Sequence, residues 1–310
     1  MILAAASSDI DFDWIDGVRG EDVLEKVLPP AASMENVKIG NIGSWRAHMN
    51  AMAKSVHNSF EIFALSSRSL IQPLTFGKSK YADPTYPSPH GVTASPPDLK
   101  FDALPSTIRP LSSPYGDGWD VLWLGHCGMN FPDTEPADTA EKSKNLPKGR
   151  VVHLNDETVP EPRYLKMHAE YEDTLEMYPP HSRIVHHAMG SICSLVYAVT
   201  QASARRILYN IGIKSFEAPF DLLLRDHCQG SEVRSYHPCL TVQPQLFNHH
   251  RPAGKKSSES DISDHGTGYR EKPITKFIRW SVRMNLERYL NGKEGYEDQF
   301  PDGVELGVLK

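Results

Sequence analysis

The feature that most constrains the fold is a short apolar run framed by two glycines. Residues 121–124 (Val-Leu-Trp-Leu) follow one another between Gly118 and Gly125. A continuous apolar run of this length, bounded by turn residues, is typical of a strand that is buried on both faces. Such strands occur mainly in parallel sheets that are covered by helices. The run therefore predicts an α/β protein with an open, twisted, mostly parallel sheet.

Helices and further strands are predicted on both sides of this run. Trp45, Met49, Met52 and Val56 lie at positions i, i+4, i+7 and i+11, which predicts an amphipathic helix over residues 43–57. Later in the chain we expect a buried strand over residues 192–199 and a helix over residues 201–211, ended by Gly212. A short helix opened by Pro219 is expected over residues 219–226, and a closing strand over residues 240–245.

The chain is expected to form one α/β domain over residues 1–252, followed by a polar loop and an amphipathic helix over residues 253–310. Residues 73–118 hold nine prolines and little periodicity, so they predict a long irregular loop inserted in the domain. From Pro273 onward, apolar residues recur at helical spacing as far as Leu290. We expect this helix to pack on the domain, although its basic face would also suit an anionic membrane surface or a partner.

Composition excludes some classes of function. The net charge of −6 and the isoelectric point near 6.2 provide no basic excess for binding nucleic acid. The sequence has no apolar stretch long enough for a transmembrane segment, and its start lacks the basic region of a signal peptide. These features predict a cytoplasmic protein, or a protein of the secretory pathway if the N-terminus is incomplete.

The four cysteines are widely scattered, at positions 127, 193, 228 and 239, and this spacing does not indicate a disulfide framework. His227-Cys228 and His237-x-Cys239 contain zinc ligands, but they lack the usual Cys-x-x-Cys spacing. A zinc site is therefore a minor alternative at this stage.

Three residues are candidates for ligand contact because of where they are expected to lie. His126 follows the apolar strand, and ligands of open α/β sheets gather at the carboxyl ends of strands. Gly40 and Gly43 precede the predicted helix, where small residues would let a diphosphate approach free backbone N–H groups. The alternatives are a hydrogen-bonded histidine at the sheet edge and an ordinary tight turn.

Four segments in the second half of the chain, taken in order, resemble glycosyltransferase family 25, which includes lipooligosaccharide and collagen galactosyltransferases and fungal relatives. They are Trp119–Cys127, Cys193–Leu208, Pro219–Leu224 and Leu240–Ser263. The resemblance implies a GT-A-like fold, a nucleotide-sugar donor (a UDP-sugar), a glycan or glycoprotein acceptor, and a divalent metal such as Mn²⁺. It implies a hexosyltransferase and leaves the oligomeric state open.

The resemblance also assigns roles to individual residues. Asp221, in the Pro-x-Asp step, would lie near the active site and contact a metal, a sugar hydroxyl or the acceptor. An acidic residue that only favours the helix dipole is the alternative. The resemblance also implies that seven further residues contact the donor or the acceptor. They are Gly40 and Gly43 in the glycine motif, His48 in the helix after it, His126 after the apolar strand, and Gln243, Ser260 and Asp261 in the last segment.

Two family features are missing from this sequence. A first strand has no counterpart before residues 9–15, whose period-two alternation itself predicts a half-buried strand. The acidic metal-binding segment expected after Val56 is also missing, and Glu61 is the only acidic residue there. A carboxylate-held cation offsets the charge of a departing nucleoside diphosphate. The sequence therefore also allows an inactive family member that binds a sugar nucleotide or acts as a scaffold. It equally allows an incomplete gene model of an ordinary enzyme, from which the acidic segment has been lost.

Overall fold

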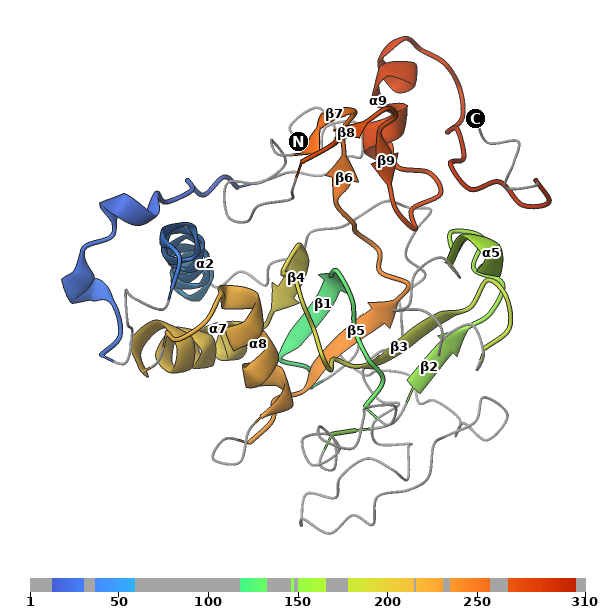
Figure 1. Cartoon of the computed structure of the whole chain (residues 1–310). Coiled ribbons are helices and arrows are strands. Elements are labelled where there is room, and N and C mark those ends of the chain that lie inside the picture. Colours follow the sequence, from blue (N-terminus) through green and yellow to red (C-terminus); the bar gives the residue numbers. More distant parts are fainter. Residues whose placement is uncertain are drawn as a thin grey trace.

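The computed structural model describes residues 13–30, 37–58, 118–132, 146–147, 150–165, 178–214, 216–230, 235–256 and 267–304. Within these ranges the chain is a mixed α/β protein built on one five-stranded sheet (Figure 1). The strands of this sheet are β1 (Val121–Gly125), β2 (Arg150–His153), β3 (Arg183–His187), β4 (Val196–Val199) and β5 (Cys239–Gln243).

The helical elements precede, interrupt and follow these strands. They are η1 (Gly20–Asp22), η2 (Glu25–Val27), α2 (Ile39–Asn58), α5 (Pro162–Leu165), α7 (Gln201–Ile207), the π-helix η5 (Leu208–Lys214), α8 (Phe220–Gln229) and α9 (Val282–Leu290). Two short two-stranded sheets pair β6 (His250–Arg251) with β9 (Ile274–Thr275), and β7 (Gly254–Lys255) with β8 (Tyr269–Arg270). None of the described helices is long and apolar enough to cross a membrane.

The prediction of a mostly parallel sheet is wrong. The strand order is β2-β3-β5-β1-β4, and only the β1–β5 pairing is parallel. The apolar run did form the buried strand β1. However, β3 is also buried along its whole length although it pairs antiparallel with both neighbours. Burial on both faces therefore reports how a sheet is covered, and it does not fix the direction of its strands.

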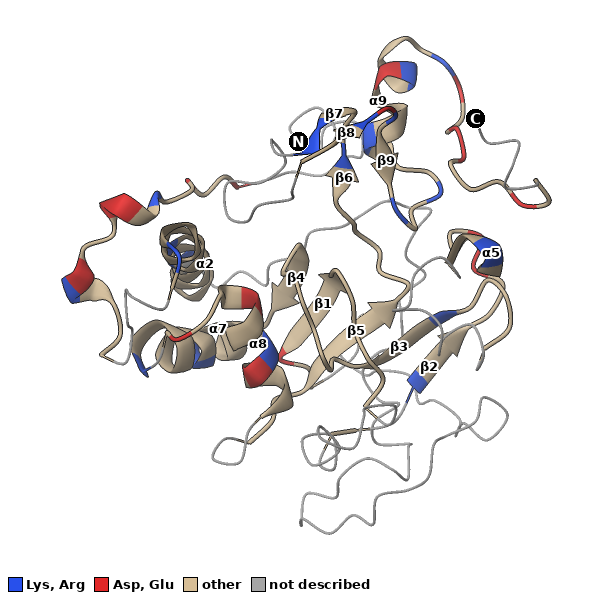
Figure 2. Cartoon of the chain, in the orientation of Figure 1, with Lys and Arg blue, Asp and Glu red and all other residues tan. Residues whose placement is uncertain are grey.

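The sheet is almost free of charge along its strands, as expected for its burial. Figure 2 shows blue segments on β2 and β3 and none along β1 and β5. The charged residues of these strands are Arg150 in β2 and Arg183 in β3, and both are buried. Arg183 pairs with Asp156 at 2.6 Å, and Arg150 donates to the Tyr178 hydroxyl at 2.6 Å. Buried cations need such partners to offset their desolvation.

One face of the sheet packs against a helical layer of α2, α7, η5 and α8 (Figure 1). The predicted helix over residues 43–57 is confirmed, and its stripe of Trp45, Met49 and Met52 is buried in this layer. The predicted stop at Gly212 is wrong, because η5 continues to Lys214. A Cβ at Gly212 would lie 2.9 Å from the Met49 sulfur, so this glycine allows close packing against α2.

The four cysteines form two disulfides, contrary to the expectation from their spacing. Cys127 pairs with Cys193 across 66 positions, and Cys228 pairs with Cys239 across 11. The antiparallel pairing of β1 with β4 brings the first pair together, because Cys127 follows β1 and Cys193 precedes β4. Sequence spacing carries little information about such pairs, since the tertiary fold decides which cysteines meet.

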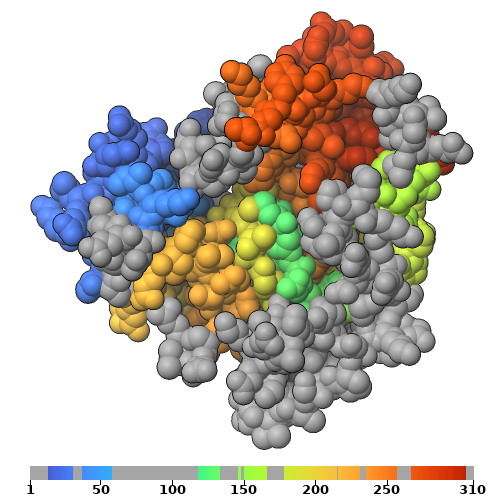
Figure 3. Space-filling model, in the orientation of Figure 1, coloured from blue at the N-terminus to red at the C-terminus, as the bar shows by residue number. Residues whose placement is uncertain are grey.

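The C-terminal segment is only partly helical. Of the helix predicted from Pro273, residues 274–275 form strand β9 and the helix α9 begins at Val282, after the cap Ser281. Between them the buried Arg279 pairs with Asp298 and Asp302. These ion pairs join residues 298–302 to Arg279 within the C-terminal segment itself, which is drawn in orange and red in Figure 3. The segment contacts residues before it in the chain: the Tyr164 hydroxyl donates to the Pro301 carbonyl at 2.7 Å.

The strand predicted over residues 9–15 falls mainly outside the described residues, and residues 13–15 are not in a strand. Instead, the segment that follows packs on the first turns of α2. A Cβ at Gly43 would lie 2.2 Å from the Val18 carbonyl oxygen, and a Cβ at Gly20 would lie 1.9 Å from the Ile39 carbonyl oxygen. The two glycines therefore let two backbones approach more closely than any side chain would permit.

We predict that Gly43→Ala destabilises the protein by about 1–3 kcal/mol, because the new methyl group overlaps a backbone carbonyl that side-chain rotation cannot move. In an exposed helix the same change would stabilise by up to about 1 kcal/mol. Urea unfolding measures the difference. Gly17→Ala is the control, since a Cβ there has no neighbour within 4 Å. Equal stability of the Gly43→Ala variant and the wild type would contradict this packing.

Candidate functional site

The parallel strands β1 and β5 end at the same edge of the sheet, and several of the candidate residues lie at or near this carboxyl edge. His126 follows β1 directly, and Gln243 is the last residue of β5. The loop before β4 reaches the same edge because β4 runs antiparallel to β1. The amino end of α8, with Asp221, contacts that loop. Residues from distant parts of the sequence thus meet where ligands of α/β sheets usually bind.

Asp221 is held in place by the backbone of this loop. It lies in the first turn of α8, is partly exposed, and accepts a hydrogen bond from the Cys193 N–H at 2.9 Å through Oδ2. The positive end of the helix dipole favours a carboxylate at this position. A partly exposed and well-oriented carboxylate can hydrogen-bond a hydroxyl group or accept its proton.

His48 reaches the same region from α2. Its ring stacks on Phe220 with 3.9 Å between the ring centroids, and its Nδ1 is hydrogen-bonded to the Tyr197 hydroxyl at 2.7 Å. Burial lowers the pKa of His48 to about 4, although the nearby Asp221 carboxylate acts in the opposite direction. His48 is therefore neutral at physiological pH. Its contacts connect α2, β4 and the residue next to Asp221, so it positions the start of α8.

His126 is not a surface residue of the edge. Its side chain is 0% exposed, and its Nε2–H donates to the Val242 carbonyl at 3.0 Å. Burial lowers the pKa of His126 to about 4. Of the two interpretations of His126 from the sequence, a ligand contact or a hydrogen-bonded histidine at the sheet edge, the second describes this geometry.

Gln243 is also directed into the protein. Its side-chain amide donates to the Met129 carbonyl at 3.2 Å and to His186 Nε2 at 2.9 Å. The Nδ1–H of His186 donates to the His187 carbonyl, so this imidazole is neutral with Nε2 as the acceptor. Burial lowers the pKa of His186 well below its usual value, which fits this assignment. Gln243 thus supplies the hydrogen bond that the Nε2 acceptor of the buried His186 needs.

The remaining predicted contacts lie elsewhere or outside the description. Gly40 and Gly43 lie within α2, which begins at Ile39, so they do not form a loop before the helix. Gly43 faces the backbone of residues 18–20, as described above. Ser260 and Asp261 fall outside the described residues, as do the positions just after α2 where an acidic metal segment was expected.

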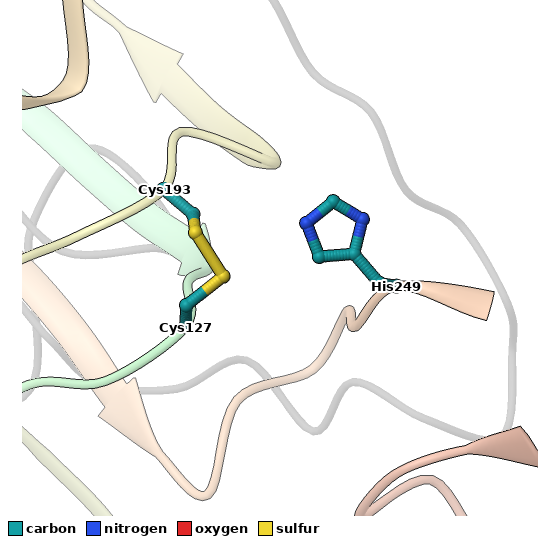
Figure 4. A group of neighbouring side chains, drawn as sticks. All are labelled: Cys127, Cys193 and His249. Atoms are coloured by element: carbon teal, nitrogen blue, oxygen red, sulfur yellow. A yellow bond between two sulfur atoms is a disulfide. The ribbon is translucent and has the colours of Figure 1, made fainter. Parts of the chain in front are cut away.

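Sequence reasoning missed the disulfide at this edge and the residues around it. Cys127, Cys193 and His249 lie together on three different loops, all partly exposed (Figure 4). Tyr197 was read only as part of a buried strand. Its alternation with Val196 and Ala198 was the one available signal that its side chain faces the helical layer and not the opposite face.

A second polar cluster lies at the opposite, amino edge of β1 and β5. Asp120 pairs with Arg206 and, through Oδ2, with His237 Nδ1 at 3.1 Å. His227 stacks on His237 with 3.9 Å between centroids and 11° between planes. Despite desolvation, which acts in the opposite direction, the His237 hydrogen bond and the Arg206 charge lower the pKa of Asp120.

This amino-edge cluster revises the zinc alternative. The ligand atoms of Asp120, His227 and His237 lie within 4.8 Å of one another, but Cys228 and Cys239 are bonded to each other and offer no thiolate. An imidazole coordinates a metal in the plane of its ring. Two nearly parallel, stacked rings therefore do not direct their nitrogens at one ion in the observed arrangement.

A scan against protein-family models finds no matching family, and searches of curated proteins and of solved structures find no match to this chain either. The expectations drawn from the resemblance to glycosyltransferase family 25 therefore stand as proposals.

The buried histidines predict acid sensitivity. The pKa of His48 and of His126 is about 4 in the folded chain and about 6.5 when unfolded, so the unfolded chain binds more protons between these pH values. The contribution of these neutral histidines to the free energy of unfolding is therefore fully present above pH 6.5. It is lost as pH falls toward 4, by up to about 1.4 kcal/mol per pH unit for each histidine.

Urea unfolding at pH 7 and pH 5 measures this effect, and we expect the free energy of unfolding to fall by at least about 2 kcal/mol. His48→Gln should make the pH dependence shallower. His57→Gln, on the exposed side of the same helix, is the control that should keep the wild-type dependence. A free energy of unfolding that is equal at the two pH values would contradict neutral burial of these rings.

Proposed function

We propose that this protein binds a nucleotide-sugar donor at the carboxyl edge of the sheet and transfers its hexose to a glycan or glycoprotein acceptor. In this proposal the mixed sheet and its helices are the core of a GT-A-like glycosyltransferase of family 25, with a UDP-sugar as donor. Support comes from the sequence resemblance, which is strongest between residues 119 and 263, and from the geometry around Asp221.

The observation that carries the proposal is the placement of Asp221. The resemblance selected this residue from its sequence context alone, and it lies partly exposed at the carboxyl edge with one oxygen fixed by the Cys193 N–H at 2.9 Å. His48, which the same resemblance selected, stacks on the adjacent Phe220. Asp221 would orient a sugar hydroxyl or accept the proton of the acceptor hydroxyl, and His48 would position α8 for this contact.

The metal of the family does not fit the described residues. Mn²⁺ prefers oxygen ligands, above all carboxylates. Among the described residues, two groups have the spacing of metal ligands; neither contains Asp221 or more than one carboxylate. We therefore assign no step of the reaction to a metal ion.

This misfit favours a second candidate function. A family member without a carboxylate cluster could still bind the nucleotide sugar through the same edge and act as a binding or scaffolding protein. Nucleotide affinity is shared by the two proposals, and only transfer distinguishes them.

We place the protein in an oxidising compartment as part of the proposal. Two disulfides are typical of proteins of the secretory pathway and are rare in cytosolic ones. They favour the secretory alternative over the cytoplasmic expectation, and a glycan or glycoprotein acceptor fits this compartment.

The test is a UDP-release and sugar-transfer assay over a panel of UDP-hexoses, with calorimetric measurement of UDP binding, each with and without Mn²⁺. We expect Asp221→Asn to lower the transfer rate by about 100-fold or more if Asp221 acts as the base, while an amide oxygen can still accept the Cys193 N–H. Asp226→Asn, on the exposed side of α8, is the matched control and should leave the rate unchanged.

The outcomes separate the two candidates. UDP binding without transfer by the wild type would support the binding protein and overturn the enzyme. Transfer that Asp221→Asn does not reduce would remove Asp221 from the reaction. Failure to bind any nucleotide sugar would contradict both candidates.

A further inference from the structure

The disulfide at the carboxyl edge lies beside a histidine from a third segment of the chain. Cys127 follows β1, Cys193 precedes β4, and His249 lies between β5 and β6. One ligand atom from each of the three residues lies within 4.8 Å of the other two. Figure 4 shows the imidazole ring beside the two sulfur atoms, with one ring nitrogen on their side. We call these three residues the disulfide–histidine cluster.

We propose that the disulfide–histidine cluster is a redox-controlled site for a thiophilic divalent cation of the Zn²⁺ type. A dithiol reductant breaks the S–S bond, supplies two electrons and two protons, and becomes a disulfide itself. The ion then binds both sulfur atoms as thiolates, and the two thiol protons are released to solvent. A nitrogen of His249 is the third ligand, and water or an external ligand completes the tetrahedron. This inference does not depend on the proposed transferase activity.

The chemistry of the three side chains suits such an ion. Two thiolates and one imidazole are preferred zinc ligands, and two thiolates neutralise its charge. An adjacent imidazole also favours the thiolate form of a cysteine, which is the form that binds metals. In the oxidised chain the sulfur atoms are bonded to each other and cannot act as thiolates, so reduction is the step that creates the site.

The geometry allows the change without moving the backbone. Zn–S bonds of about 2.3 Å at a tetrahedral angle place the two sulfur atoms about 3.8 Å apart. The Cα atoms of Cys127 and Cys193 are 5.4 Å apart. Rotation of one cysteine side chain is therefore enough to separate the sulfur atoms to this distance.

Hydrogen bonds hold the three segments together independently of the disulfide. The Cys127 N–H donates to the Ile192 carbonyl at 2.9 Å, and the Cys193 N–H donates to Asp221 at 2.9 Å. The segment leading to His249 is fixed by the Leu246 N–H, which donates to the Leu124 carbonyl at 3.0 Å. After reduction the ligands thus remain gathered at the same edge, which lowers the entropy cost of binding an ion.

The second disulfide differs in accessibility. Cys228 and Cys239 are both 0% exposed, whereas Cys127 and Cys193 are partly exposed. Thiol–disulfide exchange requires direct attack on a sulfur atom, so a reductant reaches the edge disulfide first. Mild reduction of the folded protein should therefore open the disulfide–histidine cluster selectively.

The experiment uses the full chain, oxidised or reduced with a phosphine and freed of excess reductant under anaerobic conditions. Cobalt(II) is titrated first and then displaced by Zn²⁺. We expect the reduced chain to bind about one ion and to show thiolate-to-cobalt charge-transfer absorption, which the oxidised chain lacks. Alkylation and mass spectrometry should find Cys127 and Cys193 reduced and the other pair intact, with the circular dichroism spectrum unchanged.

Three variants test the ligands. Cys127→Ser should abolish the charge-transfer band. His249→Ala keeps the disulfide and should weaken metal affinity about tenfold or more, since even changes around a metal's ligands cost this much. His250→Ala is the matched control, because its ring bonds Thr275 at 3.1 Å, outside the cluster. Equal binding by oxidised and reduced protein, no effect of His249→Ala, labelling of Cys228 and Cys239, or loss of folded structure on reduction would each overturn the proposal.

Discussion

The parallel pairing of β1 with β5 is the constraint on which the arrangement of polar groups depends. The register places Leu122 opposite Leu240 and Trp123 opposite Thr241, and the Thr241 hydroxyl donates to the Trp123 carbonyl at 2.8 Å. Because the strands run the same way, both carboxyl ends lie at one edge and both amino ends at the other. This separates Asp221 and the Cys127–Cys193 disulfide, at the carboxyl edge, from the cluster of Asp120, His227 and His237 at the amino edge. Each edge also has one disulfide, so each is fixed by a covalent bond as well as by the sheet.

The interior of this protein contains more histidine than a simple apolar core would. His126, His186 and His187 are almost completely buried, and each has a backbone carbonyl to which a ring nitrogen donates. A buried imidazole is acceptable only when it is neutral and hydrogen-bonded, since a buried charge without a partner is costly. The side chain of Gln243 supplies such a partner for His186. Residues that look like ligand contacts in the sequence can therefore be part of the core.

Local elements were predictable from the sequence because local patterns determine them. The apolar run gave β1, and the spacing of Trp45, Met49 and Met52 gave α2, within a few residues of their ends. Strand direction was not predictable, since β3 and β5 are as buried as strands of a parallel sheet. The pairing of Cys127 with Cys193 and the approach of His249 depend on contacts across more than fifty positions. No local pattern encodes contacts of this kind. Asp221 could be selected only through the resemblance of its surrounding segment.

The central claim is that the carboxyl edge, next to Asp221 and His48, is where a nucleotide sugar binds. A crystal structure of the protein with UDP and Mn²⁺ tests it most directly, because it reports the position of the ligand and not only its affinity. The account predicts density for the nucleotide at the carboxyl ends of β1 and β5, within contact distance of the amino end of α8. A nucleotide bound at the amino edge, beside Asp120 and the stacked histidines, or on another surface of the protein, would contradict it.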